Sequence, residues 1–254
     1  MRWQKSGVAL LLGVACVLGA QRSRAVDDQQ AREIVDGVDQ LLRGPSSSGT
    51  VQMQISTENW QRTLAMHIWS LGTENALIRI TKPQKEAGTA TLKVGGNIWN
   101  YLPKVNRTIK VPTSMMMASW MGSHFTNDDL VKESRLVRDY SITTSFEGPR
   151  DGVAVYEYTL TPKPEAAVVW GKIVLEVRQA DRMPTWHRYY DEDGKLVREL
   201  TFSEYKTMGG RLIPTRLVMR PTDKAGEQTV IIYDDVVFDV ALDKDLFSLP
   251  NLER

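Results

Sequence analysis

Cysteine is the scarcest residue of this 254-residue chain, with a single copy, and histidine occurs only three times. The one cysteine, Cys16, lies in an apolar run near the N-terminus. A chain that has lost this run has no disulfide and must rely on a packed core. Neither sign of charge dominates, because 32 basic residues face 31 acidic ones and the formal net charge is +1. This balance argues against a nucleic-acid partner, which requires a basic excess.

The short motifs of common enzyme classes are also missing. The chain contains no GxSxG elbow, no P-loop and no HExxH sequence. His67, His124 and His187 are far apart, and no pair has the spacing of metal ligands. The run Asp191 to Gly194 lacks the later ligands of a calcium loop and indicates a hairpin turn. The sequence therefore predicts no enzyme, metal or cofactor, although carboxylate pairs of the glycosidase type stay open.

The only long apolar run lies at the N-terminus. Arg2 and Lys5 precede the apolar residues 8–18, and Ser23-Arg24-Ala25 provides small residues for cleavage. This pattern predicts a secretory signal peptide over residues 1–25. The run is too short to span a bilayer, so we expect a soluble mature protein. A lipid anchor at Cys16 is the alternative.

Residues 26–254 contain no linker rich in proline, glycine or serine, so we expect a single domain. They begin with apolar residues at helical spacing from Ala31 to Leu42, followed by Gly44-Pro45, which predicts an N-terminal helix. From Val51 onward the apolar residues alternate instead, as in half-buried strands. Tight-turn residues recur between these strands at Gly95-Gly96, Gly148-Pro149 with Asp151-Gly152, Asp193-Gly194, Gly209-Gly210 and Asp223 to Gly226. We predict about ten or eleven antiparallel strands in a strongly curved sheet or barrel.

One segment interrupts this alternation, namely PTSMMMASWMGSHF at residues 112–125, hereafter the Met-rich segment. Pro112 ends a strand, Thr113 can cap a helix and Gly122 can end it. Met116, Met117, Trp120 and Met121 share one side of this predicted helix, with Met115 on the other. A second short helix is expected after it, capped within residues 126–129.

The predicted helix has two interpretations. It is either core that plugs the open face of the sheet, or the lid of an apolar cavity. Methionine is flexible and polarizable and is frequent on promiscuous apolar binding surfaces, which favours a lid. We therefore propose a cavity or lid that consists of Met66, Trp69, Trp99, Met115, Met116, Met117, Trp120, Met121 and Phe125.

The chain resembles the LolA-like outer-membrane lipoprotein-sorting proteins, in particular their longer branch. The resemblance lies in KVPTSMMMASWMGSHFTNDDL (110–130), DRMPTWHRYYDEDGKLVRELTFSEYKTMGGRLIPTRLVM (181–219) and DVALDKDLFSLPNL (239–252). It implies an α+β fold in which an unclosed antiparallel barrel wraps around helices. It also implies a monomeric carrier in the periplasm of a Gram-negative bacterium, which shelters acyl chains of lipoproteins or free lipid between the two membranes.

The same resemblance implies partners and leaves alternatives. An inner-membrane exporter would deliver the cargo, and an outer-membrane acceptor would receive it. In the better-known carriers, which are shorter, an arginine on an early strand contacts the lid, and Arg62 and Arg79 are the candidates here. A regulatory module that senses lipid or lipoprotein is the second hypothesis, and an enzyme acting on lipid is the third.

Overall fold

The computed structural model describes residues 29–132, 136–166 and 168–254. The predicted signal peptide and Cys16 lie outside these ranges. Within them, thirteen strands form one antiparallel sheet. The strands are β1 (Ser46–Ser56), β2 (Gln61–Leu71), β3 (Asn75–Lys82), β4 (Ala90–Val94), β5 (Asn97–Leu102), β6 (Arg107–Lys110), β7 (Tyr140–Arg150), β8 (Val153–Pro162), β9 (Lys172–Arg178), β10 (Pro184–Tyr190), β11 (Leu196–Met208), β12 (Arg211–Pro221) and β13 (Gln228–Phe238).

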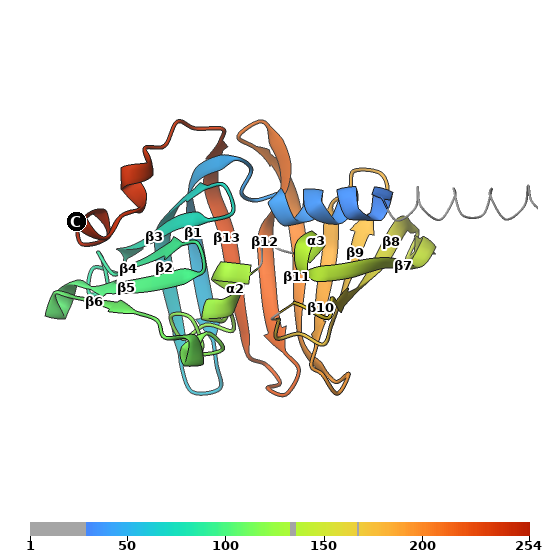
Figure 1. The fold of residues 1–254 in the computed structure, drawn as a ribbon, viewed down its shortest axis with the longest axis horizontal. Coiled ribbons are helices and arrows are strands. Elements are labelled where there is room, and N and C mark those ends of the chain that lie inside the picture. The colour runs from blue at the N-terminus through green and yellow to red at the C-terminus, as the bar shows by residue number, and fades with distance from the viewer. Residues whose placement is uncertain (1–28, 133–135, 167) are drawn as a thin grey trace, which may run out of the picture.

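The strand order is β6-β5-β4-β3-β2-β1-β13-β12-β11-β10-β9-β8-β7. Every strand pairs with the next one along the chain except β6 and β7. At the centre of the sheet β1 pairs with β13, which joins the first strand to the last. The sheet is curved but unclosed, and its two edges are β6 and β7 (Figure 1). These edges are consecutive in the chain, so the connection between them, residues 111–139, has to cross the opening of the barrel.

The predicted antiparallel fold is confirmed, but the predicted count of about ten or eleven strands is too low. A count based on apolar alternation is low because some strands show little alternation. β6 has no buried residue, and in β7 the residues after Ile142 are exposed or half-buried. Such strands are held by backbone hydrogen bonds to one neighbour, and a pattern of side-chain burial cannot reveal them. The predicted turns connect consecutive strands, except that Gly148-Pro149 lies inside β7 and only Asp151-Gly152 forms the turn there.

The predicted N-terminal helix is present over residues 29–40 and packs on one half of the sheet (Figure 1, blue). Its buried residues Ala31, Ile34, Val35 and Val38 join a hydrophobic cluster with residues from β7 to β12, including Leu175 and Leu200. The face of the sheet that this helix covers is called the inner face below.

The C-terminal segment covers the outer face of the other half. Its short helices η3 (Lys244–Phe247) and α4 (Leu249–Leu252) lie beside β3 and β4 (Figure 1, red). Phe247 and Leu252 pack there against Leu77 and Leu92. Ile78, the neighbour of Leu77, belongs to a cluster on the inner face.

The predicted helix of the Met-rich segment is wrong. Only one 3-10 turn, η2 (Thr113–Met115), forms there, and the rest is irregular. The Met116 carbonyl, which an α-helix would pair with Trp120, accepts from the Asp128 N–H at 2.8 Å. The Trp120 N–H instead donates to the Phe125 carbonyl. Hydrogen bonds to the following residues thus replace those of a helix.

The second predicted helix exists as α2 (Asn127–Lys132) and is followed by α3 (Leu136–Asp139). A 3-10 turn, η1 (Pro103–Val105), separates β5 from β6. In the described part of the chain, no helix has the length and apolar character needed to cross a bilayer.

Candidate functional site

A cavity of about 250 Å³ lies on the inner face, between the sheet and the segments that cover it. Its lining includes residues from nine neighbouring strands, from β4 across the centre to β9, so it extends across most of the sheet. The N-terminal helix, the Met-rich segment and α2 contribute the opposite wall, through residues such as Val38, Trp120 and Leu130. Most of the lining side chains are apolar, for example Ile78, Leu217 and Phe202, and such a lining suits an apolar ligand.

Trp120 fastens the Met-rich segment to the first half of the sheet. It is 4% exposed and packs among Val51, Met53 and Met66. Its indole N–H donates to the Thr91 hydroxyl at 3.2 Å, which satisfies its polar atom within the core. Trp120 therefore acts as a buried attachment point and also lines the cavity.

Arg62 on β2 reaches the same segment from the rim. Its guanidinium donates to the Met121 carbonyl at 3.0 Å and forms an ion pair with Glu86. Of the two arginines considered from the sequence, Arg62 is thus the one that contacts the Met-rich segment. Arg79 instead donates to the carbonyls of Asn251 and Arg254 in the C-terminal segment.

His124 attaches the end of the Met-rich segment to β13. Its Nδ1 lies 2.8 Å from the Thr229 hydroxyl, and its Nε2 lies 3.0 Å from a carboxylate oxygen of Glu227. The hydrogen bond with His124 holds the pKa of the Glu227 carboxyl below its usual value. The Glu227 carboxylate therefore stays ionised, and able to accept a hydrogen bond, to a lower pH than an ordinary glutamate.

A buried ion pair joins α2 to the second half of the sheet. Arg198 on β11 bonds both carboxylate oxygens of Asp129, and their side chains are 5% and 11% exposed. The Arg198 guanidinium also lies 4.5 Å from the ring centres of both Trp170 and Tyr189. The connection between β6 and β7 is thus held to both halves of the barrel by a small number of specific contacts.

The structure brings together only some of the residues proposed from the sequence. Met66, Trp120 and Phe125 line the cavity. Met116 and Met121 are half-buried but are not part of the cavity lining, and Met115 and Met117 are 52% and 45% exposed. Trp69 and Trp99 pack with the C-terminal segment on the outer face, away from the cavity.

Several cavity residues were missed from the sequence. The most informative is His187 on β10, which is 7% exposed and lines the cavity beside Tyr189 and Phe202. Alternation in PTWHRYY placed His187 and Tyr189 on one face, but which face is buried depends on distant segments. Val38 and Leu42, near the end of the N-terminal helix, also line the cavity.

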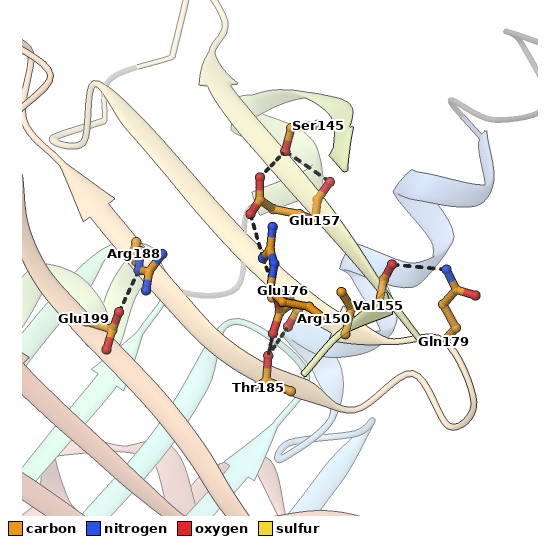
Figure 2. A network of polar contacts seen from close by, with 9 residues as sticks. All are labelled: Ser145, Arg150, Val155, Glu157, Glu176, Gln179, Thr185, Arg188 and Glu199. Carbon is orange, nitrogen blue, oxygen red and sulfur yellow. Dashed lines mark hydrogen bonds and ion pairs between the residues drawn. The ribbon is translucent and has the colours of Figure 1, made fainter. Parts of the chain in front are cut away.

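A polar network occupies the outer face of β7 to β11 (Figure 2). Arg150 lies between two carboxylates, 3.0 Å from Glu157 and 2.5 Å from Glu176, and Glu176 also accepts from the Thr185 hydroxyl. The two carboxylates share one arginine, so this network ties three strands together. In the described ranges, no group of three or more potential ligands could hold a metal ion.

Solved structures with the same architecture define the class of this protein. An outer membrane lipoprotein-sorting protein domain from Vibrio parahaemolyticus is 22% identical, with a TM-score of 0.77 over 89% of this chain and 100% of that one. A DUF1329 family protein from Desulfovibrio piger is 24% identical, with a TM-score of 0.79 over 89% and 99%. A LolA superfamily protein from Nitrosomonas europaea is 24% identical, with a TM-score of 0.72 over 87% and 98%. The fold is therefore LolA-like.

The sequence comparison then identifies the family. A family model described as "Uncharacterized protein" matches residues 72–254, well over half of the chain, and the chain belongs to this family. No curated protein matches the sequence significantly.

Proposed function

We propose that this protein is a periplasmic carrier, which shelters acyl chains of lipoproteins or lipids in its cavity during transfer between the inner and outer membranes. The observation that carries the proposal is the apolar cavity between the sheet and the connection that crosses the barrel opening. The description of the Vibrio relative as a lipoprotein-sorting domain supports the same function.

The physical need for such a carrier follows from the cost of exposing hydrocarbon to water. Each buried CH₂ group contributes about 0.8 kcal/mol, so a long acyl chain does not leave a membrane unaided at a useful rate. The cavity of about 250 Å³ lies just below the roughly 300–1,000 Å³ usual for small-molecule sites. This size suits an acyl chain better than a complete lipid, whose headgroup would stay outside.

A carrier must also release its cargo, and the cover of the cavity is suited to this. The Met-rich segment forms no α-helix and is attached through Arg62, Trp120 and His124. Breaking a few such contacts opens the cavity without unfolding the sheet. We propose an inner-membrane exporter as donor and an outer-membrane acceptor as recipient, with the carrier acting as a monomer.

Filling the cavity tests the proposal. Ala76 on β3 lines it, so Ala76→Trp places an indole in the space that the ligand would occupy. We expect this variant to bind the apolar fluorophore N-phenyl-1-naphthylamine at least about 10-fold more weakly than the wild type, because the volume is already occupied.

Ala154→Trp is the matched control, since Ala154 is exposed on β8. It should bind the fluorophore like the wild type. Circular dichroism verifies that both variants keep their β-structure. Wild-type binding by a folded Ala76→Trp variant would contradict the assignment of the cavity as the ligand site.

A further inference from the structure

His187 differs from most polar residues of the cavity, since even Arg43, whose Nε is also unpaired, donates to the Asp39 carbonyl through another nitrogen. Ser47 and Ser70 bond each other at 2.7 Å, and the Lys93 ammonium donates to the Thr73 carbonyl at 2.6 Å. By contrast, Nε2 of His187 is buried without a hydrogen-bond partner among the described residues. A buried N–H or ring nitrogen without a partner is costly, so its presence calls for a function.

On the neighbouring strands, the residues directly opposite His187 are apolar. Across the sheet it faces Leu175 on β9 and Leu200 on β11, both fully buried. The centre of its ring lies 4.7 Å from that of Phe202 and 6.4 Å from that of Tyr189, both in edge-on contacts. Among the described residues, no hydrogen bond fixes which imidazole nitrogen faces the cavity, and a 180° flip about the Cβ–Cγ bond exchanges the two.

We propose that His187 is the polar recognition group of the cavity, whose N–H donates a hydrogen bond to the ester or amide carbonyl of an acylated ligand. This inference rests on the proposed carrier function and narrows its substrate class. It predicts that the cavity prefers acyl esters and amides to hydrocarbons of equal length.

The neutral charge of His187 disfavours free fatty acids as ligands. Burial lowers the pKa of the imidazole to about 3, so the ring is neutral at neutral pH. A neutral imidazole donates through one nitrogen but cannot form an ion pair with a free carboxylate. Burying that carboxylate would also cost its hydration. Free fatty acids should therefore bind more weakly than their esters.

Competition against N-phenyl-1-naphthylamine tests the inference with three ligands, namely methyl palmitate, palmitate and heptadecane. On the wild type, methyl palmitate should compete roughly 2- to 10-fold more strongly than heptadecane, the effect of one net hydrogen bond. In His187→Phe, which keeps an aromatic ring against Phe202, this preference should disappear while heptadecane still competes. Equal competition by the ester and the hydrocarbon on the wild type would overturn the recognition role of His187 but not the carrier function.

A measurement on the wild type keeps the inference testable even where His187→Phe does not fold. The chain has three histidines, so the imidazole nitrogens are few enough to assign by ¹⁵N NMR. Methyl palmitate should shift the ring nitrogens of His187, and heptadecane should not. The same response to both ligands would overturn the inference. Failure of all three ligands to displace the fluorophore would instead overturn the carrier function, and the inference with it.

Discussion

At the scale of single residues, the two-residue period of a strand predicts which side chains share a face of the sheet, whereas composition does not. Met66 and Trp69 are three positions apart on β2, so they point to opposite faces of the sheet. Both could not line one cavity, and the structure places Trp69 on the outer face with the C-terminal segment. The burial of His187 could not be predicted in this way, because it depends on Phe202 and on the distant cover of the cavity.

The depressed pKa of His187 gives a prediction about stability. Its imidazole has a pKa of about 3 in the folded protein, against an ordinary value of 6.5, so between these values only the unfolded chain binds the proton. Stability is then lost as the pH falls from 6.5 towards 3. From pH 7 to pH 5 the wild type should lose about 2 kcal/mol more than His187→Phe. Urea unfolding at the two pH values measures this difference, and equal losses would show that His187 is not buried as a neutral ring.

At the scale of elements, the Met-rich segment shows where sequence reasoning fails. Its apolar residues, Thr113 and Gly122 have the spacing of a short capped helix, but its carbonyls bond to the residues that follow it. The Asn127 side chain donates to the carbonyls of Met115 and Ala118, and the Asp128 backbone to that of Met116. Local helix propensity has only a small effect on the free energy, so such tertiary hydrogen bonds override it. The strands and hairpins were predictable because alternation and turn residues act locally.

The same segment combines the buried side chain of Trp120 with several exposed residues, and this contrast gives a second prediction. Trp120 is buried and hydrogen-bonded to Thr91, so Trp120→Ala should lower the free energy of unfolding by about 3–5 kcal/mol. Met117 is 45% exposed, so Met117→Ala should change it by less than about 0.5 kcal/mol. Urea unfolding compares the two variants. Similar losses would mean that the whole segment is packed as core.

At the scale of the molecule, the sheet order could not be read from local patterns. Pairing of β1 with β13 joins distant residues such as Ser47 and Phe238. Just beyond β13, the Ser46 hydroxyl donates to the Val240 carbonyl, 194 positions away. This pairing leaves β6 and β7 as edges and sends the Met-rich segment across the opening. Resemblance to the LolA-like proteins predicted the unclosed barrel, whereas the residues that line its cavity became clear only from the structure.

Native mass spectrometry tests most directly whether this cavity carries acyl chains. The full chain is produced in a Gram-negative host, purified from the periplasmic fraction without detergent, and its bound molecules are extracted and identified. We expect an acylated lipid or lipoprotein bound to the folded protein, and its loss in Ala76→Trp but not in Ala154→Trp. A folded wild-type protein that carries no acylated molecule, and takes up none when incubated with phospholipid vesicles, would contradict it.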